Sequence, residues 1–436
     1  MSGRLIIVNS RADAPPALQS LASHPIEKSV LRSVWFAAEG DAVLTPVPVD
    51  PELLDHMAET VGTAPDATRM LSADRLLDSA ATRDDDIVAW AAAEAQAEPF
   101  AEVVACYANP GVAELAERVG AVLPGAAFAR EHGADLFNRK SLFRRFAAGL
   151  GCTIPAGAVA RSLDEFASAV QAILDAHGSA LVKRDNGGGG MGNVLLSDTH
   201  VEPAAGASRV VRRDHIDLPE LWAELTGVGE SSVVVESYEP PERGSFYIEY
   251  LIGADGEPQH LADGAIDSRP APGSAHLAWV GLRLGERAAG DAYSVARRQS
   301  DRLAGFAAAT GYRGRLNVDH MVTAEGAVLL NETNARWGGG TVLDAVARRL
   351  LGPGYAETAS VSSLRDLPAL SYREARRRLA GSGLLYDPAT AHGAVVLATS
   401  PRTSSTMELL TVAGTRAAAG ELETELRRAF GAPQPG

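Results

Sequence analysis

The stretch from residue 313 to residue 341 constrains the fold most, because it reads as a β-hairpin with polar side chains at matched positions: RGRLNVDHMVTAEGAVLLNETNARWGGGT. Glu325-Gly326 predicts a two-residue turn between two apolar runs. With residue 324 then facing residue 327, Asp319 lies opposite Glu332 and Asn317 lies opposite Asn334. Because strand side chains alternate between the faces of a sheet, these four side chains share one face.

The two opposed carboxylates predict a divalent cation between them. Like charges at this spacing repel each other, so the pairing costs stability unless something positive lies between them. Ligation by oxygen alone suits Mg²⁺, which prefers a few carboxylates together with phosphate oxygens and water. Arg336 and the glycines 338–340 would place a cation and flexible backbone beside this site. A solvated polar hairpin end, with the pairing displaced by one residue, is the alternative.

A second informative stretch is the glycine run within LVKRDNGGGGMGNVLLS, residues 181–197. Three of its glycines match G-x-G-x-x-G, but the following NVLLS reads as a strand, whereas a dinucleotide-binding loop opens a helix. The pattern G-x-x-x-x-G-K-[ST] is absent because the chain has no Gly-Lys pair. A glycine-rich hairpin whose N–H groups close over a polyphosphate fits better, and a flexible surface turn is the alternative. Lys183, one of three lysines against 37 arginines, lies just before this loop, four positions ahead of its first glycine.

Composition narrows the class of protein. The 436 residues allow two to four domains, and a net charge of −15 is the wrong sign for holding a nucleic-acid backbone. Cys106 and Cys152 are far apart, which supports neither a disulfide framework nor a zinc site. We find no secretion signal in the first residues and no apolar run of membrane-spanning length, so we expect a cytoplasmic protein without membrane partners.

The order of apolar runs predicts an α/β protein with several units. In residues 1–130, short apolar runs alternate with helical stretches, one of them near 26–38, which indicates βαβ units and a parallel sheet; the runs are Leu5–Val8, Ile87–Trp90 and Val103–Cys106. Residues 153–236 read as a small α+β unit with a helix over 163–177. Strands dominate from 245 to 340, with a hairpin turn at 253–256, and the tail after residue 354 ends in a helix near 416–430.

Taken in order, these features resemble the ATP-grasp carboxylate–amine ligases. They are a lysine on an amphipathic helix, a lysine before a glycine-rich hairpin, a strand ending in glutamate, and Asp with Glu-x-Asn-x-Arg on paired strands. Within that family the chain is most similar to the pheganomycin-type peptide ligases of actinobacteria, through NRKS, LNETNARWGGGT and a GLLYDP-type hairpin. The resemblance implies a multidomain α/β and α+β fold with a Rossmann-like pre-ATP-grasp domain at 1–130, an ATP-grasp core at 131–350 with a lid subdomain at about 153–236, and a C-terminal domain at 351–436.

The resemblance also assigns roles to individual residues. The nucleotide phosphates would be bound by Lys140 and Lys183 and covered by the lid loop, formed by Gly187, Gly188, Gly189, Gly190, Met191 and Gly192. The adenine and ribose would contact the hinge at Glu236, Tyr238 and Glu239. The Mg²⁺ ligands would be Asp319, Glu332 and Asn334. Catalysis would use Lys183 and Arg336 near the transferring phosphoryl group, with Arg315 or Arg336 stabilising the tetrahedral intermediate, since Asn317 stands where some members have arginine.

The implied reaction is ATP-dependent formation of an amide or peptide bond. ATP would phosphorylate a carboxylate to an acyl phosphate, and an amine would then displace phosphate, with natural-product biosynthesis as the setting. The cofactors would be ATP and two Mg²⁺ ions, with Mn²⁺ as a substitute. The partners would be a small carboxylate and an amine or peptide, and a second copy of the chain by family analogy.

Two other functions stay open at this stage. One is ATP-grasp transfer of phosphate or carboxylate without amide formation, and another is a nucleotide-binding module without chemistry. A Ser/His/Asp hydrolase is disfavoured because G-x-S-x-G is absent. His320, on the face of the hairpin opposite Asp319, is expected to be a packed histidine rather than a base. The identity of the substrates is not encoded in any recognisable pattern.

Overall fold

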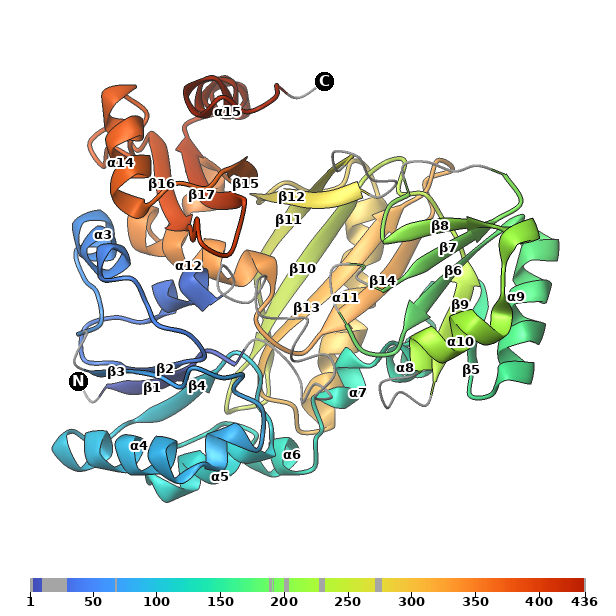
Figure 1. Cartoon of the computed structure of the whole chain (residues 1–436), viewed down its shortest axis with the longest axis horizontal. Helices are drawn as coiled ribbons and strands as arrows, with labels where there is room; N and C mark the ends of the chain where they lie inside the picture. The colour runs from blue at the N-terminus through green and yellow to red at the C-terminus, as the bar shows by residue number, and fades with distance from the viewer. Residues whose placement is uncertain are drawn as a thin grey trace.

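The computed structural model describes residues 3–9, 30–66, 69–187, 190, 192–199, 204–226, 232–270 and 277–434. Three sheets organise the chain (Figure 1). A four-stranded sheet lies at the lower left, an eight-stranded sheet crosses the centre and a five-stranded sheet lies at the right. Among the described residues, no helix is long and apolar enough to cross a membrane.

The first sheet is parallel throughout, as the alternating pattern predicts, with the strand order β3-β2-β1-β4. Its strands are β1 (Arg4–Ile7), β2 (Ala42–Thr45), β3 (Met70–Ser72) and β4 (Glu102–Ala105). The accompanying helices are η2 (Val34–Phe36), α3 (Pro51–Val61), η4 (Ala81–Arg83), α4 (Asp85–Ala97) and α5 (Pro110–Arg118).

Two details of the first unit differ from the sequence prediction. The run Ile87–Trp90 belongs to helix α4 and not to a strand, because a four-residue apolar run fits either structure. The helix expected near 26–38 falls partly outside the described residues, and its described part continues into the short helix η2. Helix α5 begins shortly after β4, where Asn109 caps it by accepting the N–H of Val112.

The five-stranded sheet, in the order β5-β9-β6-β7-β8, forms the unit predicted as the lid subdomain. Its strands are β5 (Gly157–Ala160), β6 (Ser179–Arg184), β7 (Val194–Ser197), β8 (Arg209–Arg212) and β9 (Val233–Ser237). Helices α9 (Leu163–His177) and α10 (Leu218–Thr226) pack on it, and the short helix η5 (Arg213–His215) precedes α10. Because β6 and β7 are antiparallel neighbours, the glycine run joins a hairpin, which excludes the dinucleotide-binding alternative. Gly188, Gly189 and Met191 lie outside the described residues.

The central sheet has the order β14-β13-β10-β11-β12-β15-β17-β16 and therefore continues from the predicted core into the C-terminal region. Its strands are β10 (Ser245–Ile252), β11 (Pro258–Pro270), β12 (Leu277–Leu284), β13 (Gly314–Val322), β14 (Val328–Asn334), β15 (Ser360–Pro368), β16 (Gly393–Ala398) and β17 (Thr406–Ala413). The helices around it are α11 (Ala292–Ala309), α12 (Gly339–Leu351), α13 (Tyr355–Thr358), α14 (Tyr372–Gly381) and α15 (Arg416–Phe430). The hairpin at 253–256 and the last helix match the sequence prediction.

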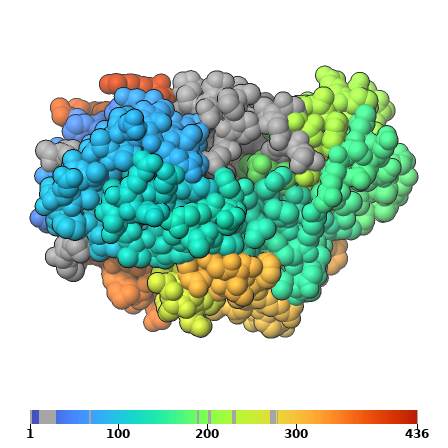
Figure 2. Space-filling view, turned by 90° about the horizontal axis from the view of Figure 1, so that it is seen from below, coloured from blue at the N-terminus to red at the C-terminus, as the bar shows by residue number. Residues whose placement is uncertain are grey.

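Three short helices connect the first unit to the lid unit: α6 (Ala126–Arg130), α7 (Asp135–Asn138) and α8 (Lys140–Gly149). Seen from below, this stretch forms the teal surface between the blue first unit and the green lid unit (Figure 2). Residues 134–152 contribute to a core that they share with β10, β13 and α11. The connection is therefore packed against the central sheet.

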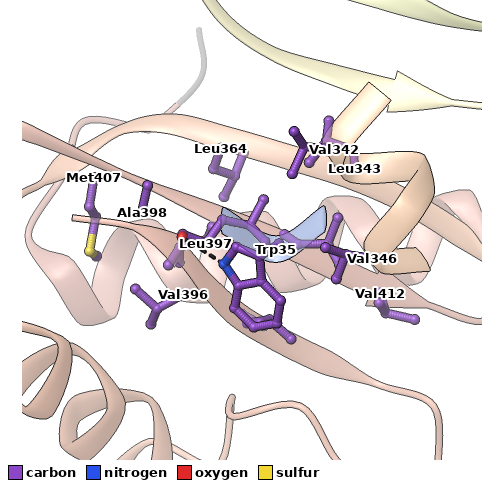
Figure 3. Close-up of a cluster of buried hydrophobic side chains, with 14 of the residues drawn as sticks. Trp35, Val342, Leu343, Val346, Leu364, Val396, Leu397, Ala398, Met407 and Val412 are labelled. Carbon is purple, nitrogen blue, oxygen red and sulfur yellow. Dashed lines mark hydrogen bonds between the residues drawn. The ribbon is translucent and has the colours of Figure 1, made fainter. Parts of the chain in front are cut away.

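The largest core joins the N-terminal unit to the C-terminal region around Trp35 (Figure 3). The indole is fully buried, and its Nε1 donates a hydrogen bond to the carbonyl oxygen of Leu397 at 2.9 Å. It lies among side chains from α12, β15, β16 and β17, including Val342, Val346 and Leu364. A buried tryptophan removes a large apolar area from water, so these parts stabilise one another.

Candidate active site

Strands β13 and β14 confirm the predicted pairing of the acidic hairpin. Asp319 lies opposite Glu332, and Asn317 lies opposite Asn334. The predicted two-residue turn is wrong, however, because Thr323 pairs with Ala327 around a three-residue loop. This change shifts the register by one residue, so that His320 lies opposite Leu330 and Met321 opposite Leu329. A β-bulge before Glu332 then restores the predicted register.

The bulge residue is Asn331, which sequence reasoning missed. An extra residue in one strand lets two consecutive side chains point to the same side, and Asn331 and Glu332 both line the cavity described below. The Nζ of Lys183 donates a hydrogen bond to Oδ1 of Asn331 at 3.0 Å. Through Asn331, the bulge therefore connects the hairpin to strand β6, which carries Lys183.

Both predicted phosphate-binding lysines are buried at the same cavity. Lys140 is the first residue of α8, and its Nζ donates to the carbonyl oxygen of Gly187 at 2.6 Å. The same Nζ lies 3.7 Å from a carboxylate oxygen of Glu332. Lys183, on β6, is ion-paired with Glu236 on β9. The two lysines thus converge from different elements toward the acidic hairpin.

Asp185 joins the two lysine-bearing elements, and sequence reasoning missed it. Its carbonyl oxygen accepts the N–H of Lys140 at 3.0 Å, and its carboxylate accepts the N–H of Ser141 at 2.7 Å. The guanidinium of Arg139 lies 2.7 Å from the same carboxylate. The carboxylate therefore caps α8 from another part of the chain. Its position two residues after Lys183 was the only signal in the sequence.

The residues predicted to form the hinge line the same cavity. Glu236 is buried between Lys183 and Arg144, whose Nη1 lies 3.0 Å from its carboxylate. The hydroxyl of Tyr238 accepts the N–H of Ala205 at 2.9 Å. The carboxylate of Glu239 accepts a hydrogen bond from the hydroxyl of Ser237 at 2.7 Å. Contacts of these residues with adenine and ribose stay predictions.

The two candidate catalytic arginines have different surroundings. Arg336 lines the cavity and donates from Nη2 to Oδ1 of Asn334 at 2.6 Å. Arg315 is not among the described residues that line the cavity. Its guanidinium lies 3.0 Å from the buried carboxylate of Glu249 and over the ring of Phe36. The geometry therefore favours Arg336 over Arg315 as the arginine at the reacting groups.

Burial and neighbouring charges shift the pKa values of Asp319 and Lys140. Burial raises the pKa of Asp319 well above its usual value, Glu332 raises it further and Arg336 lowers it. Burial also lowers the pKa of Lys140, with Glu332 acting in the opposite direction. Because the charged form of Asp319 is disfavoured, a cation bound beside it would be stabilising.

The predicted Mg²⁺ ligands can be tested by their donor chemistry. Among the described residues no group of three or more His, Cys, Asp or Glu side chains is placed to hold a metal. Asp319, Glu332 and Asn334 offer carboxylate and amide oxygens on one face, which suits a hard cation that completes its shell with phosphate oxygens and water. The residues present therefore fit Mg²⁺ that arrives together with a nucleotide.

The cavity has a volume of about 360 Å³ and is lined by residues of the central sheet, the lid unit and the start of α12. His320 is buried in the sheet, as expected, with its ring stacked on Phe246 at 5.2 Å between centroids. The predicted site residues that line the cavity are Lys140, Lys183, Gly190, Glu236, Tyr238, Glu239, Asp319, Glu332, Asn334 and Arg336.

Comparisons with known proteins agree with this architecture. The family model described as the Pre ATP-grasp domain matches residues 30–121. The ADP complex of an N5-carboxyaminoimidazole ribonucleotide synthetase is similar over 98% of this chain and 96% of that chain, with 14% sequence identity and a TM-score of 0.59. This chain has the ATP-grasp fold.

Other similar structures also cover nearly the whole of this chain. An L-amino acid ligase from Bacillus licheniformis is similar over 98% of this chain and 97% of that chain, with 13% identity and a TM-score of 0.55. The ATP complex of carboxyaminoimidazole ribonucleotide synthase from Aspergillus clavatus covers 98% of each chain, with 12% identity and a TM-score of 0.57. The model described as the PGM1 C-terminal domain matches residues 374–426. No curated protein matches the sequence.

Proposed function

We propose that this protein is an ATP-dependent carboxylate–amine ligase that forms an amide or peptide bond through an acyl phosphate. One observation carries the proposal: Lys140, Lys183 and Arg336 converge with the opposed carboxylates of Asp319 and Glu332 on a single cavity. Cations facing a carboxylate pair suit a triphosphate that brings Mg²⁺, because each charge then has a partner.

In this proposal the protein's own groups position reactants and neutralise charge. Lys140 and Lys183 hold the phosphates, and Asp319, Glu332 and Asn334 hold Mg²⁺, which neutralises charge on the phosphates. Arg336 stabilises the charge that develops on the transferred phosphoryl group. Gly190, the described glycine of the run that lines the cavity, helps to keep water from the acyl phosphate. No nucleophile from the protein is required.

The finer proposal is a peptide ligase of the pheganomycin type that acts in natural-product biosynthesis. It is supported by the sequence motifs and by a layout of a pre-ATP-grasp domain at 1–130, a core at 131–350 and a C-terminal domain at 351–436. Family-model matches near both ends of the chain support the same layout.

Carboxylate transfer is the second candidate, since carboxyaminoimidazole ribonucleotide synthetases are among the similar structures. The TM-scores of 0.59 and 0.55 for a synthetase and an amino acid ligase do not separate the two reactions. Dependence of turnover on bicarbonate does separate them, because a ligase has no use for it.

The deciding experiment incubates the protein with Mg·ATP, a pool of amino acids and hydroxylamine, with and without bicarbonate. Hydroxamate formed together with ADP, independently of bicarbonate, is the expected result. AMP as the product would replace acyl phosphate chemistry by adenylation, and ADP formed only with bicarbonate would favour carboxylation. The Glu332→Ala variant is expected to be inactive, whereas Glu325→Ala, an exposed change in the same hairpin, is the matched control and stays active.

A further inference from the structure

The cavity has a second end beyond the carboxylate pair. It continues from β10 across β11 and β12 to the first turn of α12, where it is lined by Tyr247, Ile266, Ser268, Trp279, Leu282 and Gly339. Tyr247 is the cross-strand neighbour of Asp319, so this end begins directly beside the predicted metal ligands. We call these six residues the Trp279 end.

The Trp279 end carries no charge among the described residues that line it. Among the described lining residues, the charged side chains lie outside this group of six: Lys140, Lys183, Glu236, Glu239, Asp319, Glu332 and Arg336. A charged group that entered the Trp279 end would leave water without finding a counter-charge, which is strongly unfavourable. An apolar group would gain by the same transfer.

Trp279 is held in place with its indole N–H already bonded, so the ring offers only carbon atoms to the cavity. Its Nε1 donates to the carbonyl oxygen of Gly281 at 2.8 Å, so the indole N–H is already used. The guanidinium of Arg365 lies 3.9 Å from the ring centroid. Gly339 packs so closely that a Cβ there would lie 2.8 Å from the ring. Arg365 is itself ion-paired with Glu408, so its charge is balanced behind the ring.

Tyr247 provides the one unsatisfied polar group at this end. Its side chain is 2% exposed, and its hydroxyl has no hydrogen-bond partner among the described residues. The hydroxyl lies against the first turn of α12, where a Cβ on Gly340 would approach it to 2.3 Å. Buried hydroxyls are rarely left without a partner, and a phenylalanine would fill the same space without that cost.

We propose that the Trp279 end binds the uncharged, apolar side chain of an amino-acid-like carboxylate substrate, and that the hydroxyl of Tyr247 hydrogen-bonds the polar head of that substrate. The inference rests on the proposed function and names its substrate class. It places the head group between Tyr247 and Asp319, where phosphoryl transfer would occur, and the side chain against Trp279.

The first test measures binding and turnover separately. Isothermal titration in the presence of Mg·ADP compares L-leucine, L-methionine and L-phenylalanine with L-lysine, L-arginine and L-glutamate, and the hydroxamate assay gives kcat/KM for the same acids. The uncharged acids are expected to bind at least about tenfold more tightly. Equal or tighter binding of a charged acid, or no binding of any acid, would overturn the inference. Selective binding without hydroxamate would leave the inference standing and contradict the proposed function instead.

The second test changes one group at a time. Tyr247→Phe is expected to raise KM about tenfold for every acid that binds, without changing KM for ATP. Tyr250→Phe is the matched control, because that hydroxyl donates to Asp301 on the other face of the same strand. Ser268→Asp is expected to improve L-lysine relative to L-leucine by about tenfold. Unchanged affinities in Tyr247→Phe, or unchanged selectivity in Ser268→Asp, would contradict the assignment.

Discussion

Lys183 is held by two acceptors, the carboxylate of Glu236 and the amide oxygen of Asn331. These contacts keep a long, flexible side chain pointing into the cavity, so less side-chain entropy is lost when a phosphate binds. Replacing Lys183 by Met keeps the length of the side chain and removes the charge. We expect KM for ATP to rise at least about tenfold, measured by initial rates over an ATP series. A KM equal to that of the parent protein would remove Lys183 from the nucleotide site.

His56 makes stability depend on pH. Burial between α3 and the C-terminal region, together with the nearby charge of Arg376, lowers the pKa of His56 to about 3. The unfolded chain therefore takes up a proton below about pH 6.5, while the folded chain does not do so until about pH 3, so stability falls as the pH drops between these values. Between pH 7 and pH 5 this histidine costs roughly 2 kcal/mol.

A His56→Gln variant keeps an acceptor for the N–H of Val396, which bonds to Nε2 of His56 at 3.2 Å. Its Tm is expected to fall less between pH 7 and pH 5 than that of the parent protein, as measured by differential scanning calorimetry. Parallel Tm curves for the two proteins would show that His56 is not a source of the pH dependence.

The sequence predicts some site residues well and misses others for a physical reason. Asp319, Glu332 and Asn334 lie in one hairpin, so their pairing follows from local strand geometry. Asp185 and Tyr247 act through contacts with distant segments, and no local pattern encodes such contacts.

At the level of elements, the hairpin β13–β14 reaches the predicted pairing through two irregularities that compensate for each other. The three-residue loop has Gly326 at a φ of +87°, a value that glycine adopts readily, and it displaces the register by one residue. The bulge at Asn331 displaces it back. The sequence predicts the pairing of Asp319 with Glu332 but neither the three-residue loop nor the bulge. Alternation along a strand fixes which side chains share a face, but it does not show where an extra residue is inserted.

Deleting Asn331 tests the role of the bulge. The strand is then expected to continue in the register of the turn, with Glu332 still opposite Asp319, so Mg²⁺-dependent turnover survives. KM for ATP is expected to rise several-fold, because Lys183 loses one of its two acceptors. Initial rates and far-UV circular dichroism check this outcome, and a folded but inactive protein would mean that the bulge itself positions Glu332.

Helix ends and strand assignments differ in how well they can be predicted. Helix α9 begins where Ser162 caps it by accepting the N–H of Glu165 and ends at Gly178, so its predicted bounds agree with the structure. Strand β2 has no such signal, and the three apolar residues that begin it resemble the apolar run within α4.

On the scale of the whole molecule, one buried carboxylate joins three parts of the chain. Glu408 on β17 is fully buried, and its oxygens face Arg32 of the N-terminal unit at 3.1 Å and Arg365 of β15 at 2.5 Å. Arg32 also donates to the carbonyl oxygen of Gly339 at 2.6 Å. Burial, partly offset by the charge of Glu408, lowers the pKa of Arg32 to about 10. The C-terminal region therefore supports both Gly339 and, through Arg365, Trp279.

Glu408→Gln leaves the buried Arg32 and the partly buried Arg365 without the charge of Glu408. We expect a loss of about 3–5 kcal/mol in the free energy of unfolding, measured by urea titration. In the folded fraction KM for the acid substrate is expected to rise while KM for ATP stays the same, because only the Trp279 end is disturbed. Glu425→Gln, an exposed change on α15, is the matched control. A stability equal to that of the parent protein would show that water replaces the missing charge.

The same three residues limit how such a chain can recombine with its relatives. An exchange of everything after residue 350 would bring in new residues at 365 and 408 but retain the native Arg32. In such a hybrid the buried charge of Arg32 is balanced only where the incoming segment again supplies an acid at position 408. Whether a natural or engineered crossover at residue 350 gives a stable protein therefore depends on the residue at the buried position 408. The family model for the C-terminal domain begins well beyond this crossover point, at residue 374.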